Sequence, residues 1–221
     1  FYVAPTGSPH LVALNPRFMS GDLWRNAYYC GGAFSLALTF SWLCFEVASR
    51  TSGAGLLPEF DVRELLRELP LLTLDEKCGC GPVKAYRDYV SRDRRDGFWK
   101  ALSVREKMGR FEVPVLLTGG WYDYYAGETF ANYRSLVEHA PTRALADSHR
   151  VIVGPWTHGI NPSTLLGQLD FGPEALREND STVRWLDCLL KGGNAKDFQA
   201  APIRIFVMGG NHWRDEHEWP P

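Results

Sequence analysis

The spacing of apolar positions changes near the middle of the chain, and the two halves predict different structure. In residues 62–69 the apolar positions recur at i, i+3, i+4 and i+7, the spacing of one helix face, and Asp61 precedes them as a candidate N-cap. Helical segments are also predicted over residues 27–48 and 83–92. The first half is therefore expected to be mainly helical, with a glycine-containing break at residues 51–55.

The second half alternates short apolar runs with helical segments. Strands are predicted over residues 113–118, 150–154 and 203–208, with helices over residues 127–139 and 173–191 between them. Parallel strands need a long crossover connection, and a helix between them supplies it. The order strand, helix, strand, helix, strand thus predicts an α/β fold whose parallel sheet is covered by helices.

A helical block at residues 27–108 interrupts this pattern, because a further short strand is predicted before it, at residues 11–14. We therefore interpret the block as an insertion into an α/β core made of residues 1–26 and 109–201, with residues 202–221 beginning a further part. A sheet of two or three parallel strands cannot bury both faces and leaves long open edges. The chain is accordingly expected to be the central and C-terminal part of a larger domain.

Composition and charge describe an ordinary globular protein and exclude several classes of partner. The 221 residues are 45% apolar and carry a formal net charge of -2, so no basic surface for nucleic acid is predicted. No run reaches the roughly 20 apolar residues that cross a bilayer, so we expect no membrane association. A cytoplasmic location is expected. The five cysteines contain no Cys-x-x-Cys pair, which favours reduced thiols over disulfides or a structural zinc site.

Two short motifs place an acid and a histidine after successive predicted strands. The first, Gly-Gly-Trp-Tyr-Asp, ends at Asp123, and the second, Gly-Pro-Trp-Thr-His, ends at His158. The carboxyl ends of parallel strands meet at one edge of a sheet, where an acid can orient a histidine for general-base catalysis. The alternative is that Asp123 caps the helix that begins near Ala126. No Gly-x-Ser-x-Gly turn, which would carry a nucleophilic serine, occurs in the sequence.

The same motifs resemble the cocaine esterase/X-Pro dipeptidyl-peptidase family of α/β-hydrolases. The resemblance also includes Phe-Val-Met-Gly at residues 206–209 and Trp-Arg-Asp at residues 213–215. The similarity covers residues 111–221 well and the helical block loosely. The resemblance implies a partial α/β-hydrolase sheet with a helical cap at residues 27–108, and the start of a C-terminal jelly-roll β-domain at residues 202–221. The serine of such an enzyme, on a Gly-x-Ser-Tyr-x-Gly turn, would precede the first residue.

Carried over to this sequence, the resemblance implies roles for individual residues. Asp123 matches the catalytic acid, His158 matches the catalytic histidine, and Tyr125 matches an aromatic position that lines the acyl pocket. Three more aromatic residues are candidate substrate contacts, with ordinary packing as the alternative for each: Trp156, Trp42 and Phe45.

Acidic and imidazole side chains near the end of the chain raise the alternative of a metal site. They are His212, Asp215, Glu216, His217 and Glu218. The tryptophan and proline residues among them favour a loop at a domain junction instead, so we expect no metal and no cofactor. Glu128, close to the first motif, is interpreted as a first-turn helix charge.

Together with the acid and the histidine, the resemblance implies a serine-type acyl hydrolase that cleaves an ester, amide or Xaa-Pro peptide bond of a small substrate through an acyl-enzyme. The chain would supply the acid and the histidine but not the serine, and alone it would be nearly inert. One alternative makes Asp123 the nucleophile, as in dehalogenase-like enzymes, but Trp121 and Tyr125 stand where that turn needs glycine. The other alternative is a non-catalytic binding domain on the same scaffold. The oligomeric state is left open between a monomer and a homo-oligomer.

Overall fold

A computed structural model of the chain describes residues 1–48 and 61–221 and divides it into two compact units. The first unit consists of Phe1–Asp22 and Ser103–Pro221, and the second consists of Leu23–Leu102. No helix among the residues that the structure describes is long and apolar enough to cross a membrane.

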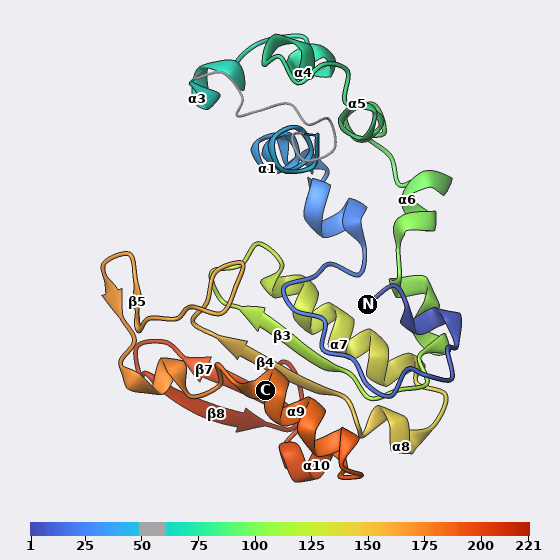
Figure 1. Cartoon of the computed structure of the whole chain (residues 1–221), viewed down its shortest axis with the longest axis vertical. Helices are drawn as coiled ribbons and strands as arrows, with labels where there is room; N and C mark the ends of the chain where they lie inside the picture. Colours follow the sequence, from blue (N-terminus) through green and yellow to red (C-terminus); the bar gives the residue numbers. More distant parts are fainter. Residues whose placement is uncertain (49–60) are drawn as a thin grey trace. The chain divides into compact units, whose positions relative to one another are not determined.

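The first unit is built on a four-stranded sheet with the order β3-β4-β7-β8 (Figure 1). The strands are β3 (Leu116–Gly120), β4 (Arg150–Gly154), β7 (Ile203–Val207) and β8 (His212–Glu216). The first three run parallel to one another, and β8 is antiparallel to β7. The predicted α/β class with a parallel sheet is therefore confirmed, and β4 has the predicted bounds.

The strand β3 begins and ends later than predicted and continues through the two glycines of the first motif. Pro114 has no N–H group to donate to a neighbouring strand, whereas Gly119 and Gly120 pair with the last residues of β4. A Cβ on Gly120 would lie 2.2 Å from the carbonyl oxygen of Trp156. Glycine is thus required here by a close approach of two backbones rather than by a turn.

Alternate residues of the strands face opposite sides of the sheet, and each side is covered by a helix. Val153 packs in one core cluster with α7 (Ala126–His139). Ile152 packs in another with Trp185 of α9 (Ser181–Leu190). Both faces of the central strands are therefore buried, as a parallel sheet requires. The helix predicted between the first two strands is confirmed as α7.

The helix predicted over residues 173–191 is divided into η6 (Pro173–Leu176), a 3-10 turn, and α9. Between them the chain turns Glu178 inward, where its buried carboxylate pairs with Arg184 and Arg204. A buried carboxylate needs such partners, so the ion pairs account for the interruption. The remaining short elements of this unit are η1 (Ala4–Thr6), η5 (Arg105–Arg110), α8 (Arg143–Ala146), β5 (Leu165–Leu166), β6 (Leu169–Asp170) and α10 (Ala195–Phe198).

Two segments at the edges of the sheet differ from the predicted organisation. Residues 202–221, expected to begin a C-terminal β-domain, contain β7 and β8 and extend the same sheet within the first unit. The strand predicted at residues 11–14 is reduced to isolated parallel bridges, among them Leu14 to Val115. This segment runs along the edge of β3 that β4 leaves free.

The second unit is mainly helical, as predicted, but its first predicted helix is wrong near its start. Within residues 27–48, β1 (Tyr29–Cys30) and β2 (Ala33–Phe34) pair as an antiparallel hairpin. Gly31 and Gly32, with φ values of 61° and 89°, form its turn. Left-handed backbone of this kind favours glycine, so the glycine pair breaks the helix here.

The other helical predictions in this unit hold in part. Asp61 caps α3 (Val62–Leu65) by accepting a hydrogen bond from the amide of Arg63 at 2.8 Å, although the helix is shorter than predicted. The break predicted at residues 51–55 lies outside the described residues. The helix predicted over residues 83–92 is confirmed as α5 (Lys84–Val90). The other helical elements in the described part of this unit are η2 (Trp24–Tyr28), α1 (Leu36–Phe40), η3 (Ser41–Ala48), η4 (Leu71–Thr73), α4 (Leu74–Lys77) and α6 (Gly97–Leu102).

Candidate active site

The loops that follow β3 and β4 are tied to each other by backbone hydrogen bonds. The amide of Trp121 donates to the carbonyl of Gly154 at 2.9 Å, and the amide of Tyr122 donates to the carbonyl of Trp156 at 3.0 Å. The next residue of the first loop is Asp123. Its position is thus fixed relative to the second loop at the carboxyl end of the sheet.

The two loops bring Asp123 and His158 together. Nδ1 of His158 lies 3.0 Å from Oδ1 of Asp123, which is hydrogen-bond distance. The carboxylate is buried, whereas 47% of the His158 side chain is exposed. The contact predicted from the two motifs is therefore present. The alternative role of Asp123 as a helix cap is not seen, because the N-cap of α7 is Tyr125 and no described side chain caps it.

Burial dominates the electrostatics of Asp123 and raises the pKa of its carboxyl above the ordinary value. The hydrogen bond from His158 and the nearby amides of Tyr124 and Tyr125 lower this pKa in part. Among the residues that the structure describes, Oδ2 of Asp123 has no hydrogen-bond partner. The carboxylate thus lies in a site of low polarity, with the imidazole as its side-chain partner.

The orientation of the imidazole determines its chemistry. When Nδ1 carries the proton and donates to the carboxylate, Nε2 keeps its lone pair. No hydrogen bond of Nε2 to a described residue occurs. A histidine in this tautomer can accept the proton of a hydroxyl group in general-base catalysis. The buried position of Asp123 also argues against its acting as a nucleophile, because its carboxylate does not reach open space.

Three aromatic rings surround the imidazole of His158. Tyr124 stacks on it with ring centroids 4.7 Å apart, while Tyr125 and Phe18 meet it edge-on at 5.6 and 6.0 Å. Burial and the charge of Asp123 raise the pKa of Tyr124 to about 12, so its phenol stays neutral near neutral pH. The rings limit the rotation of the imidazole and provide an apolar wall beside it.

Two of these rings belong to residues that the sequence motifs do not indicate. Tyr124 directly follows Asp123, and its place in the motif is a signal that could have found it. Phe18 is distant in sequence and adopts an unusual φ of 50°, for which no local pattern gives a sign. Its amide donates to the carbonyl of Thr118 at 2.8 Å, which holds it beside β3.

The three remaining predicted substrate contacts lie in different environments. Trp156 is 1% exposed and packs in a core cluster with Phe18, which favours the packing role over a substrate contact. Trp42 is 51% exposed, and Phe45 packs edge-on against Phe40 with ring centroids 5.2 Å apart. Because Trp42 and Phe45 belong to the second unit, their assignment as substrate contacts stays a prediction.

The acidic residues near the end of the chain form ion pairs. Asp215 pairs with Arg204 at 2.6 Å, and Glu216 pairs with Arg214. Within residues 1–48 and 61–221, no group of three or more His, Cys, Asp or Glu side chains is arranged to hold a metal ion. The charges of this segment therefore stabilise the strands β7 and β8.

Glu128 stands in the first turn of α7, as interpreted, and is also a buried anchor. Its Oε2 accepts hydrogen bonds from the hydroxyl of Ser20 at 2.9 Å and from the amides of Gly21 and Asp22 at 3.0 and 3.2 Å. Arg105 donates to both carboxylate oxygens at 2.6 Å. The side chain therefore joins this loop to the helix that follows the candidate acid.

Replacing Glu128 with glutamine is expected to lower the free energy of unfolding by about 3–5 kcal/mol. The change leaves the Arg105 guanidinium without its charge partner and turns an NH₂ group toward hydrogen-bond donors. Urea denaturation followed by circular dichroism measures the difference. Glu138→Gln, at an exposed position of the same helix, is the matched control and should change stability by less than about 0.5 kcal/mol. Equal losses in the two variants would contradict the anchoring role.

Two solved structures have the same fold as this chain. One is an aminopeptidase from the marine sediment archaeon Thaumarchaeota archaeon, with a TM-score of 0.79 and 20% identity over 99% of this chain and 37% of that chain. The other is an alpha-amino acid ester hydrolase, with a TM-score of 0.75 and 21% identity over 99% of this chain and 36% of that chain. Together with the parallel sheet, these likenesses define the fold as that of the α/β-hydrolases.

The family model described as X-Pro dipeptidyl-peptidase (S15 family) matches residues 1–160, which include both motifs. The chain therefore belongs to the X-Pro dipeptidyl-peptidase (S15) family. A curated relative, the cocaine esterase of Rhodococcus sp. (strain MB1 Bresler), is 28% identical over 238 aligned residues. The alignment covers 98% of this chain, which spans 39% of the length of that relative.

Proposed function

We propose that this chain supplies the acid and the histidine of a serine-type acyl hydrolase that cleaves an ester or an Xaa-Pro amide bond. The observation that carries the proposal is the 3.0 Å contact between the buried Asp123 and the half-exposed His158. Membership of the S15 family and the likeness to a cocaine esterase support this class of reaction. In this proposal the nucleophilic serine belongs to a part of the protein outside residues 1–221, since these contain no Gly-x-Ser-x-Gly turn.

In the proposed reaction, Nε2 of His158 accepts the hydroxyl proton of the serine while the serine oxygen attacks the carbonyl carbon of the substrate. The bond to the leaving group then breaks, and His158 returns the proton to the departing alcohol or amine. Water attacks the acyl-enzyme by the same route, which releases the acid and restores the serine. Asp123 keeps the imidazole in the Nδ1–H tautomer and stabilises its charged form.

The aromatic rings beside His158 support a preference among substrates. Tyr124 and Tyr125 form an apolar wall next to the ring that would exchange protons with the substrate. Aromatic side chains bind apolar and aromatic groups through area and edge-to-face contacts. We therefore expect the substrate to carry an apolar group close to the scissile carbonyl, as an aryl ester does.

The proposal is tested by expressing the intact reading frame that contains this chain and treating the purified protein with a fluorophosphonate probe, which labels activated serines. We expect labelling of the wild-type protein and its loss in His158→Ala, because the serine then lacks its general base. His10→Ala, at an exposed histidine of the same unit, is the matched control and should be labelled like the wild type. No labelling of the wild type would favour a non-catalytic binding domain, and equal labelling of wild type and His158→Ala would contradict the role of His158 as the general base.

A further inference from the structure

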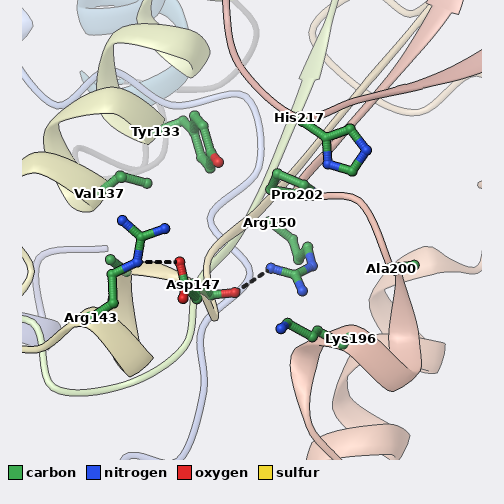
Figure 2. Close-up of a pocket in the computed structure, with 10 residues that line it drawn as sticks. Tyr133, Val137, Arg143, Asp147, Arg150, Lys196, Ala200, Pro202 and His217 are labelled. Carbon is green, nitrogen blue, oxygen red and sulfur yellow. Dashed lines mark hydrogen bonds and ion pairs between the residues drawn. The ribbon is translucent and has the colours of Figure 1, made fainter.

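A polar cleft lies at the opposite end of β4 from His158. Its volume is about 480 Å³, and its charged and polar lining consists of Tyr133, Arg143, Asp147, Arg150, Lys196 and His217 (Figure 2). Arg150 is the first residue of β4, whereas the loop that carries His158 follows the last residue, Gly154. At about 3.3 Å per residue, the strand separates the two regions by roughly 13 Å. The cleft is therefore distinct from the candidate active site.

Arg150 brings a buried positive charge to this cleft. The residue is 1% exposed, and its Nε donates to the carbonyl of Gln199 at 2.8 Å. Its Nη1 donates to the carbonyls of Asp147 and His149, each at 2.8 Å. These acceptors are neutral, and the hydrogen bonds described for the guanidinium include none to a carboxylate. Burial lowers the pKa of Arg150, which is the direction expected for a cation that lacks a full counter-charge.

Other side chains make the lining of the cleft positive as a whole. Lys196 reaches it from α10 and forms no ion pair with a described acidic residue, whereas Arg143 pairs with Asp147 at 2.9 Å. Three cations thus face one carboxylate. Tyr133 and His217 also line the cleft (Figure 2). Several N–H and O–H donors around a net positive charge are suited to an oxyanion.

We propose that this cleft binds the phosphate or carboxylate group of a small organic anion. Arg150 and Lys196 supply the charge that holds the anion, and the hydroxyl of Tyr133 donates a further hydrogen bond. Val137 and Pro202 line the same cleft and contact the organic part of the ligand. This binding function goes beyond the proposed hydrolysis and does not depend on it, because the two sites share no side chain.

The proposal is tested by isothermal titration calorimetry of the protein expressed from the intact reading frame. The protein is titrated with inorganic phosphate and, separately, with succinate, and sodium chloride keeps the ionic strength constant. Saturable binding of at least one of the two anions is expected. Phosphate binding alone would identify a phosphorylated ligand, and succinate binding alone a carboxylate ligand. Saturable binding of neither anion would overturn the proposal.

Variants keep this test specific to the cleft. Lys196→Gln is expected to weaken anion binding about fivefold, as for the loss of one exposed charge contact. Ala200→Glu, which places a carboxylate at the exposed rim, should abolish binding. Lys191→Gln is the matched control, because Lys191 is exposed and pairs with Asp187 outside the cleft. Equal weakening by Lys196→Gln and Lys191→Gln would overturn the proposal and indicate non-specific attraction by charge.

Discussion

Replacing His158 with glutamine in the intact reading frame is expected to lower kcat for hydrolysis of a nitrophenyl ester by about 10⁶-fold. Glutamine can still donate a hydrogen bond to Asp123, but its amide does not accept a proton near neutral pH. The proton transfer belongs to the transition state, so KM should change much less than kcat. Steady-state kinetics of the purified variant and of the wild type separate the two parameters.

The control for this prediction is His10→Gln, since His10 is an exposed histidine of the same unit. Its kcat should equal that of the wild type. The free energy of unfolding should change by less than about 1 kcal/mol in both variants, because the His158 side chain is already half-exposed. A folded His158→Gln protein with kcat within about tenfold of the wild type would contradict the proposed role.

The meeting of Asp123 and His158 is predictable from the sequence because it follows from local patterns. Each residue lies a few positions beyond an apolar run, and the helix α7 between the runs makes the two strands parallel neighbours. Parallel neighbours end at the same edge of the sheet, so their following loops lie together. The proximity of the two side chains therefore follows from the order and period of the elements, whereas the 3.0 Å contact also depends on the backbone hydrogen bonds between the two loops.

The surroundings of this pair are less predictable because they depend on contacts between distant segments. Phe18 reaches the His158 ring only because its own segment runs along β3, and this segment is too short and irregular to read as a strand. In the sequence, Glu128 has only the features of an acidic residue in the first turn of a helix. Its role as a buried anchor depends on the loop containing Ser20, which packs against it. Neither position has a signature in its own neighbourhood.

Two glycine pairs also show that the structure at a position depends on contacts with distant segments. Gly119 and Gly120 continue β3 because the neighbouring backbone lies too close for a side chain, whereas Gly31 and Gly32 form a hairpin turn. Both pairs are adjacent glycines next to apolar residues. The difference lies in what packs against them, so the strand predicted over residues 113–118 stops before the first pair, and the helix predicted over residues 27–48 runs through the second.

Replacing Asp123 with asparagine is expected to lower kcat for the same ester by about 10⁴-fold. Asparagine fits the same space, but it carries no charge to stabilise the protonated imidazole, and its amide can hold His158 in the wrong tautomer. The loss should again appear in kcat rather than in KM.

The same substitution should leave the protein at least as stable as the wild type at neutral pH. Burial raises the pKa of Asp123 in the folded protein above its unfolded value of about 3.9, so folding disfavours the ionised form. The ionised carboxylate therefore costs stability at neutral pH, and this cost disappears as the pH falls through the folded pKa. Asparagine removes the cost, so the advantage of the variant should be present near pH 7 and vanish near pH 4.

Urea denaturation of Asp123→Asn and wild type at the two pH values measures this advantage, and kinetics of the same samples measure the loss of activity. Asp187→Asn, at an exposed aspartate that pairs with Lys191, is the control and should change neither quantity appreciably. An Asp123→Asn protein that is both inactive and clearly less stable at neutral pH would assign the residue to structure. An Asp123→Asn protein that is inactive but equally or more stable would show that the wild type keeps the buried charge of Asp123 for its effect on His158, at the expense of stability.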